Sequence, residues 1–226
     1  MNRVKGHERS LIGGALSANG QVFLVNSNGI LFGKGVSVNT ATLVASTLNI
    51  KNKDFNEGDY SFSGDGGQIV NKGQIKTVDG GFVALLGGDV HNEGVIVATR
   101  GTVSLNGANK ATLNFNEDIL VSVSLDEGAL NALVKSQNAI FADGGSIILT
   151  AKSADSLVAS QVNVEGILQS RALNDLTEKI VVYAHGGQAR NVDRSQCLYY
   201  CRGRRYEWSG GKSGLGFERR FDDLFT

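Results

Sequence analysis

The side chains that could bind a metal ion lie near the end of the chain. His185, Cys197 and Cys201 are the candidates, and these cysteines are the only two in the 226 residues. Structural zinc sites usually combine a closely spaced Cys pair with two further ligands. Here the Cys-x-x-Cys spacing is absent and no fourth ligand is evident. We therefore predict no metal site and no cofactor.

Acidic residues could instead cleave a glycan if they met along one groove. Asp65, Asp79 and Asp143 each precede a Gly-Gly pair, a pattern that turn formation explains without catalysis. His7 and His91 are isolated, with no evident nucleophile to activate. We therefore predict that the protein is not an enzyme. A carbohydrate-active enzyme built on a β-helix is the most distant alternative.

Two further patterns near the C-terminus could bind phosphates. Gly210-Gly-Lys-Ser213 is similar to the end of a phosphate-binding loop, but the first glycine of that motif would fall on Tyr206. A nearby cluster mixes basic and aromatic residues, as single-stranded nucleic-acid sites do; it contains Tyr199, Tyr200, Arg202, Arg204, Arg205 and Tyr206. The formal net charge of the chain is zero, and a charged, disordered end explains the cluster more simply. We predict no nucleotide or nucleic-acid partner.

The composition favours a protein with many tight turns. Glycine occurs 30 times and proline is absent, so the corners must be formed by Gly, Asn and Asp. Apolar residues make up 41% of the chain, which is enough for a core. No apolar run approaches the ~18 residues that a membrane-spanning helix needs.

Short related segments recur along the chain and indicate a repeat. Each segment has a turn residue that is followed two positions later by an apolar residue. The turn positions are 29, 73, 94, 139 and 166, and the apolar residues are Leu31, Ile75, Ile96, Phe141 and Leu168. These intervals fit a unit of about 21 residues, taken once singly and twice doubled, with an insertion in the last interval.

A second strand type accompanies the first. Its apolar pairs occupy matching places and are Val83 and Leu85, Val103 and Leu105, and Ile147 and Leu149. Two short strands per unit with glycine corners between them are typical of a parallel β-helix. A β-sandwich would also alternate, but it does not require the same side-chain class at a fixed period. The sequence therefore predicts an all-β solenoid.

One segment interrupts the period. Residues 118–125 alternate as a strand does, whereas residues 126–135 have the pattern of a short helix or an extended excursion. We interpret residues 114–136 as an extra-helical insertion. The alternative is a less regular coil.

Five segments match, in order, the motifs of one protein family. They are Asn2-Arg-Val4 and residues 20–33, 43–50, 144–152 and 162–167. These segments resemble the N-terminal secretion domain of filamentous haemagglutinin-like exoproteins, the adhesins and cytolysins that Gram-negative bacteria export by two-partner secretion. The resemblance, over residues 2–180, implies a right-handed, single-stranded parallel β-helix, the haemagglutination activity domain, which is not an enzyme.

The resemblance also implies a partner and a route. Such domains stay unfolded in the periplasm and are recognised there by the periplasmic domains of an outer-membrane β-barrel transporter. They then fold at the cell surface, where they nucleate the folding of the passenger that follows. Host-cell surface glycans or proteins would be bound by the full-length exoprotein.

A family motif, Asn-Pro-Asn-Gly, maps onto Asn26, Ser27, Asn28 and Gly29. The residues by themselves predict a β-helix corner, and the resemblance adds transporter recognition. Serine replaces the proline that would preset φ at the second turn position. We expect the turn to survive, because Gly29 can still supply a positive φ.

Asn71 and Asn92 share a later turn position, 21 residues apart. We expect their side chains to form a short amide ladder that satisfies backbone groups at the corner. The other places in this ladder are predicted to be Ser27, Gln137 and Val164.

Both ends depart from the family pattern. Family members carry a signal peptide and a capping stretch ahead of the Asn-Arg-Val motif, whereas this sequence starts at Met1. Residues 180–226 hold eight Lys or Arg and five Asp or Glu, both cysteines and the only tryptophan. We predict a secretion domain at residues 1–180, truncated at both ends, and a divergent tail at 181–226, disordered or frameshifted. Without a signal peptide the chain would remain cytoplasmic, whereas intact family members are secreted to the cell surface.

The sequence thus predicts a secretion-targeting and folding-nucleation domain of a large exported adhesin, present as a gene fragment. The alternative is a stand-alone adhesive β-solenoid that binds a host glycan or protein. An adhesin would bind its target as a purified protein, whereas a secretion domain requires its transporter.

Overall fold

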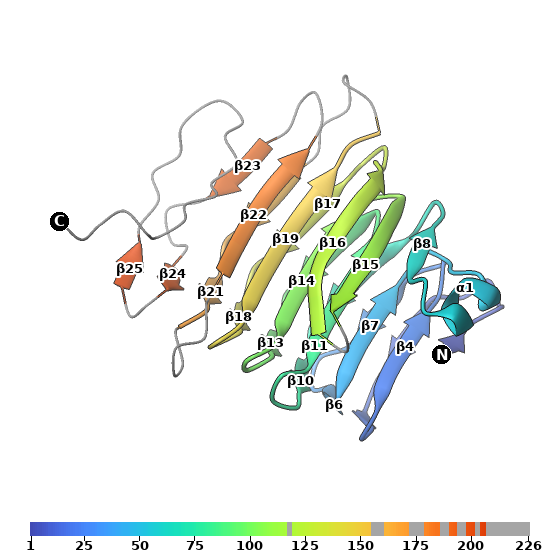
Figure 1. The fold of residues 1–226 in the computed structure, drawn as a ribbon, viewed down its shortest axis with the longest axis horizontal. Helices are drawn as coiled ribbons and strands as arrows, with labels where there is room; N and C mark the ends of the chain where they lie inside the picture. Colours follow the sequence, from blue (N-terminus) through green and yellow to red (C-terminus); the bar gives the residue numbers. More distant parts are fainter. Residues whose placement is uncertain are drawn as a thin grey trace.

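The computed structural model describes residues 1–116, 119–154, 161–171 and 179–185, and the backbone alone of residues 190–193, 198–201 and 204–206. Short strands wind into coils that stack along one axis (Figure 1). Neighbouring coils pair in parallel throughout the three sheets of the stack. The predicted all-β parallel β-helix is confirmed.

Each coil contributes one strand to each of three sheets. Sheet A contains, in spatial order, β1 (Asn2–Arg3), β4 (Gln21–Val25), β7 (Thr42–Ser46), β11 (Phe82–Gly87), β14 (Thr102–Gly107), β19 (Ser146–Lys152) and β22 (Lys179–His185). Sheet B contains β2 (Ser10–Ile12), β5 (Ile30–Phe32), β9 (Gln68–Asn71), β12 (Asp89–Asn92), β17 (Leu133–Ser136), β20 (Gln161–Val164) and β23 (Arg190–Asp193). Sheet C contains β3 (Ala15–Ser17), β6 (Ser37–Thr40), β10 (Gln74–Thr77), β13 (Val95–Val97), β18 (Ala139–Phe141), β21 (Ile167–Gln169) and β24 (Leu198–Cys201), and β25 (Arg204–Tyr206) adds to it antiparallel.

The coil therefore has three strands, not the predicted two. The pairs Val83 and Leu85, Val103 and Leu105, and Ile147 and Leu149 stack in register in sheet A, as predicted. The sequence did not distinguish the strands of sheet B as a separate set, because it aligned β5 of this sheet with strands of sheet C. Their inward positions include Ile69, Val90 and Val134, all fully buried.

Two of the predicted inward positions are wrong. Ile75, Ile96 and Leu168 stack inside the helix, but their neighbour in sheet C is Ile140 rather than Phe141. Leu31 is not in this stack at all, because it pairs with Val70 in sheet B and is partly exposed. The sequence aligned the turn at position 29 with the later turns of the repeat, but this turn lies at a different corner of the helix.

Extra-helical elements leave the stack at two places. The first follows β7 and consists of α1 (Asn52–Glu57) and β8 (Ser61–Ser63), which the sequence did not predict. The second follows β14 and is a hairpin of β15 (Lys110–Asn116) and β16 (Ile119–Glu127). The two long intervals between turns, from 29 to 73 and from 94 to 139, were interpreted as two repeat units each. These extra-helical segments explain their length instead. The hairpin begins before the predicted start at 114 and ends before the predicted boundary at 136. Residues 133–136 form β17, so the helical alternative for residues 126–135 is wrong.

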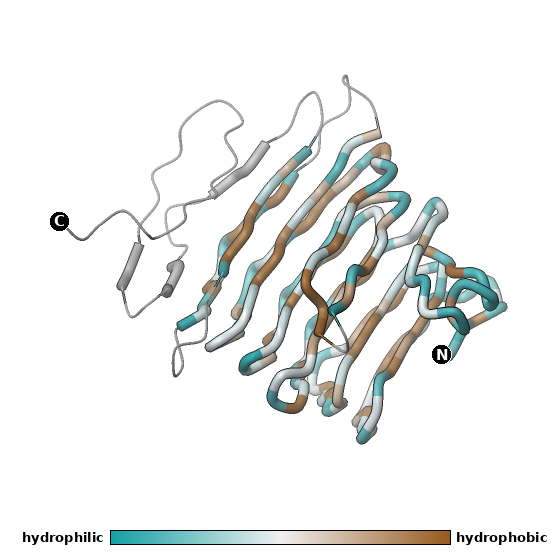
Figure 2. Tube along the Cα trace, in the orientation of Figure 1, coloured by the Kyte–Doolittle hydropathy of each residue, from teal (hydrophilic) through white to brown (hydrophobic). Residues whose placement is uncertain are grey.

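The interior is a column of side chains contributed by every coil, and all but Phe32 are aliphatic. Figure 2 shows that the strands of successive coils, which run side by side, are rich in hydrophobic residues. A second core lies outside the helix, where β8, β15 and β16 cover the outer face of sheet A. Its aromatic members are Phe23, Phe55, Tyr60, Phe62, Phe82 and Phe115. Within the described residues no helix is long and apolar enough to cross a membrane.

Strand pairing continues beyond the boundary predicted at residue 180. β22, β23 and β24 extend the three sheets by one more coil. Residues 207–226 lie outside the described residues, and the prediction of a divergent tail therefore stays a prediction.

Candidate functional site

The motif Asn26 to Gly29 forms a tight turn between β4 and β5. The Gly29 N–H donates to the Asn26 carbonyl at 3.1 Å, which closes a four-residue turn. Gly29 has φ of +116°, and a Cβ there would lie 3.1 Å from the Gln68 carbonyl oxygen. Both facts require glycine at this position. The turn forms with serine at position 27.

Ser27 stands on the exposed side of the turn. Its carbonyl accepts a hydrogen bond from the Gly67 N–H at 3.1 Å. Among the described residues, the Ser27 N–H donates to no backbone carbonyl. Proline, which lacks this donor, would therefore cost no backbone hydrogen bond at position 27.

The Asn26 side chain is fully buried and makes contacts on both sides of the turn. Its Nδ2 donates to the Glu8 carbonyl at 3.0 Å and to Ser10 Oγ at 2.9 Å. Its Oδ1 accepts from the backbone N–H of Asn28 at 3.0 Å and from Asn28 Nδ2 at 3.2 Å. Asn26 thus holds the shape of its own turn and fixes the preceding coil at the same time.

Asn28 is exposed but extends the same network. Its Nδ2 donates to the Gly6 carbonyl at 2.7 Å. We call the two asparagines, the backbone of residues 6–10 and the Ser10 hydroxyl the first-coil clamp. Sequence reasoning missed this clamp, because Gly6, Glu8 and Ser10 have no pattern that marks their carbonyls and hydroxyl as partners of residues 26 and 28.

The predicted amide ladder forms at a second corner. Asn71 Nδ2 donates to Asn92 Oδ1 at 2.9 Å, and Asn71 Oδ1 accepts from the Gly73 N–H at 3.1 Å. The next place belongs to Ser136, whose Oγ accepts from Asn92 Nδ2 at 3.5 Å, and not to the predicted Gln137. Val164 follows as predicted, whereas Phe32 takes the place that was assigned to Ser27.

The three acids that precede Gly-Gly pairs do not gather. Asp79 and Asp143 lie at the same corner with Thr99 between them, whereas Asp65 accepts a hydrogen bond from Asn109 at 3.0 Å elsewhere. Asp79 forms an ion pair with Arg100. The Asp143 carboxylate accepts from Arg171 Nη2 at 2.7 Å, from the Arg171 backbone N–H at 2.9 Å, and from Gln169.

Asp143 accordingly stays ionised. Burial by itself would raise the pKa of this carboxyl, but the hydrogen bonds from Arg171 and Gln169 and the charge of Arg171 outweigh burial and lower the pKa. A general acid needs a raised pKa, so Asp143 is unsuited to that role. Its contacts hold the corner of β21 against the corner of β18.

Replacing Asp143 with asparagine is expected to destabilise the protein by about 1 kcal/mol at neutral pH. Because the folded-state pKa is lowered, the stabilisation is present above the unfolded pKa and is lost as the pH falls through the folded pKa. Urea unfolding should be measured from neutral pH down through the folded-state pKa of Asp143. The free energies of unfolding of the parent and of Asp143→Asn should converge at the lowest pH. Asp59→Asn, at an exposed site, is the matched control, and an equal effect there would contradict this role.

The histidines and cysteines do not assemble. Among the residues whose side chains are described, no group of three His, Cys, Asp or Glu could hold a metal ion. His91 pairs with Asp89 at 2.7 Å, His7 is exposed, and burial followed by the charge of Lys152 lowers the pKa of His185. Cys197, Arg202 and residues 210–213 lie outside the described residues, and only the backbone is described for Cys201 and the Arg and Tyr residues of β24 and β25.

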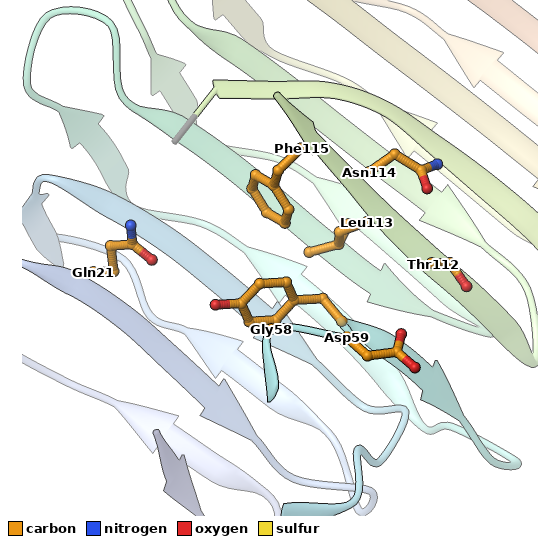
Figure 3. Close-up of a pocket in the computed structure, with 8 residues that line it drawn as sticks. Gln21, Gly58, Asp59, Thr112, Leu113, Asn114 and Phe115 are labelled. Atoms are coloured by element: carbon orange, nitrogen blue, oxygen red, sulfur yellow. The ribbon is translucent and has the colours of Figure 1, made fainter. Parts of the chain in front are cut away.

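A surface groove of about 460 Å³ lies between the extra-helical elements and β4 (Figure 3). It is lined by Gln21, Gly58, Asp59, Tyr60, Thr112, Leu113, Asn114 and Phe115. The Tyr60 ring stacks on Phe23, with centroids 5.4 Å apart, and meets the edge of Phe115. Because these rings belong to the second core, the groove lies at the exposed edge of that core.

Comparison with known proteins identifies the family of the chain. The model of the family described as TPS secretion domain matches residues 1–192. A heme/hemopexin-binding protein of Haemophilus influenzae strain Rd is 35% identical over 201 residues, which cover 84% of this chain and 22% of that protein. A second heme/hemopexin-binding protein of Haemophilus influenzae is 30% identical over 216 residues, covering 84% of this chain and 23% of that protein.

A solved structure shares the fold. The crystal structure of the HMW1 secretion domain from Haemophilus influenzae aligns with a TM-score of 0.66 at 28% identity, covering 88% of this chain and 58% of that chain. The present chain spans about a fifth of the length of the curated relatives it matches. It belongs to the TPS secretion domain family, the secretion-targeting domains of two-partner-secretion exoproteins.

Proposed function

We propose that this chain is recognised, before it folds, by the periplasmic domains of an outer-membrane β-barrel transporter, and that it then nucleates folding of the exported protein. The observation that carries the proposal is the complete burial of Asn26 in the first-coil clamp. A transporter can contact the Asn26 amide only while the first coil is open. Recognition and folding therefore use the same side chain one after the other.

The clamp also explains why folding would start at this end. In a solenoid each coil is stabilised mainly by its neighbours, so the first coil has the weakest support. β1 and β2 contribute five residues to the sheets, and both lie at an edge. The amide hydrogen bonds from Asn26 and Asn28 supply additional links between the two first coils. Once these links form, β4, β5 and β6 offer a complete template for the next coil.

Replacing Asn26 with alanine is expected to reduce export through a cognate transporter about 5- to 30-fold, because the loss of one or two hydrogen bonds weakens recognition by about 1 to 2 kcal/mol. The measurement is the secreted fraction when the domain is co-expressed with the transporter behind a signal peptide. Asn39→Ala is the matched control, since Asn39 is exposed and its side chain, among the described residues, bonds only to Ser37 Oγ.

The location of the variant protein separates the two proposed roles. A recognition defect leaves the chain in the periplasm, whereas a folding defect releases a chain that surface proteases degrade. Export of Asn26→Ala at the level of the parent, in a protease-resistant form, would contradict both roles. Ser27→Pro should export at least as well as the parent, because the turn accepts proline without loss of a backbone hydrogen bond.

The host-directed activity of the exoprotein is proposed to lie outside this domain. The matched relatives are named for heme and hemopexin binding, and the present chain aligns with less than a quarter of their length. We infer that the whole exported protein binds a host molecule through its remaining length.

A further inference from the structure

Three Asn-Gly pairs occur in the sequence, at Asn19-Gly20, Asn28-Gly29 and Asn106-Gly107. Asn-Gly pairs are the sites most prone to spontaneous deamidation, because glycine does not shield the backbone nitrogen that attacks the side-chain amide. In this reaction the nitrogen of glycine bonds to Cγ of asparagine, and ammonia leaves with the proton of that nitrogen. Water then opens the resulting succinimide to aspartate or to isoaspartate.

The folded structure treats the two exposed pairs differently. Asn19 and Gly20 are both exposed, and no hydrogen bond of the Asn19 side chain is present among the described residues. Asn28 is also exposed, but its Nδ2 is held by the Gly6 carbonyl and by Asn26 Oδ1. The attacking Gly29 nitrogen donates its proton to the Asn26 carbonyl at 3.1 Å.

The backbone on both sides of Asn28 is fixed as well. The Asn28 N–H donates to Asn26 Oδ1 at 3.0 Å, and the Gly29 carbonyl accepts from the Ser10 N–H at 2.9 Å. Attack on Cγ requires rotation about bonds that these contacts hold, and it also requires loss of a hydrogen-bonded proton from Gly29. Asn106, in β14, is held by Ser104 and Thr150 and is buried.

We propose that Asn28 is a conformation-gated deamidation site, protected while the first-coil clamp is closed and reactive while the chain is unfolded. The product cannot rebuild the clamp. A carboxylate at position 28 would place an oxygen against the Gly6 carbonyl and Asn26 Oδ1, where an N–H donor now lies. Isoaspartate would in addition lengthen the backbone inside a four-residue turn.

This chemistry has a consequence for export, and only this consequence rests on the proposed function. A chain that waits unfolded for a transporter exposes Asn28 throughout the wait. Deamidation would then mark long-delayed chains and impair closure of their first coil. The fraction of chains that can no longer close the first coil would therefore increase slowly with the time spent unfolded.

The test compares deamidation of the purified chain in native buffer and in concentrated urea, at the same mildly alkaline pH, by peptide mapping with mass spectrometry. In urea Asn19 and Asn28 should react at similar rates. In native buffer Asn19 should continue to react, whereas Asn28 should slow by about tenfold or more, which corresponds to a local opening free energy above about 1.4 kcal/mol. Asn19 is thus an internal reference within the same molecule.

Two outcomes would overturn the proposal. The first is equal reactivity of Asn28 and Asn19 in native buffer, and the second is absence of reaction at Asn28 in urea. Asn26→Ala removes the acceptor that holds Asn28 and should raise the native rate at Asn28 toward that of Asn19. After refolding, chains with isoaspartate at position 28 should lose hydrogen-exchange protection at the Ser10 amide. No step involves a transporter, so failure of the proposed secretion role leaves this result unaffected.

Discussion

Replacing Gly101 with alanine is expected to destabilise the β-helix by more than about 3 kcal/mol. Gly81, Gly101 and Gly145 stack in successive coils ahead of β11, β14 and β19. A Cβ on Gly101 would overlap the carbonyl oxygen of Gly81. Because the obstacle is backbone of the neighbouring coil, no side-chain rotation can relieve it. The coils would have to separate, which breaks parallel ladders on both sides.

Urea unfolding followed by circular dichroism measures this loss. Gly20→Ala is the matched control, because Gly20 occupies the same column one coil before Ala41 and a Cβ added there would have no neighbour within 4 Å. That variant should differ from the parent by less than about 1 kcal/mol. Similar midpoints for the two variants would show that the glycine column is not a packing requirement.

Truncating Phe62 to alanine is expected to cost about 3 to 5 kcal/mol and to release the extra-helical sheet from the coils. Phe62 lies in β8 with no exposed surface, in the second core between sheet A and the hairpin of β15 and β16. A cavity of this size cannot be refilled by the aliphatic column, which lies on the opposite face of sheet A.

Hydrogen exchange resolves where the protection is lost. Amides of residues 110–116 and 119–127 should exchange faster in Phe62→Ala, while those of β11 and β14 should keep most of their protection. Ile119→Ala, at a side chain that is 60% exposed in the same hairpin, should change little. Uniform loss across all coils would mean that the two cores unfold as one unit.

The repeat was readable in the sequence because a β-helix returns each coil to the same environment. Positions such as Ile75, Ile96 and Leu168 meet the same aliphatic column in every coil, so their side-chain class recurs at a fixed phase. The register of the first coil was not readable, because two different corners share one turn chemistry. Asn26 Oδ1 accepts from the N–H of Asn28, and Asn71 Oδ1 accepts from that of Gly73.

The extra-helical elements could be predicted only in part, because their limits and packing depend on contacts with the coils. The β15 and β16 hairpin alternates because one face packs on sheet A, but its limits follow from where the chain can rejoin sheet B. α1 has no buried residue, and its sequence therefore carries no helical apolar stripe. Residues 51–63 are recognisable as an insertion only because β7 and β9 are consecutive strands of the same coil.

The sequence alone determined the repeat, most of its inward residues and the Asn26 to Gly29 turn, since these depend on local period and turn preference. Only the tertiary structure decided that Asn26 and Asn28 hold the backbone of residues 6–10, because those partners come together when one coil settles on the next. It also decided which face of sheet A carries a second core. Both are contacts between distant segments, and no local pattern records the partner.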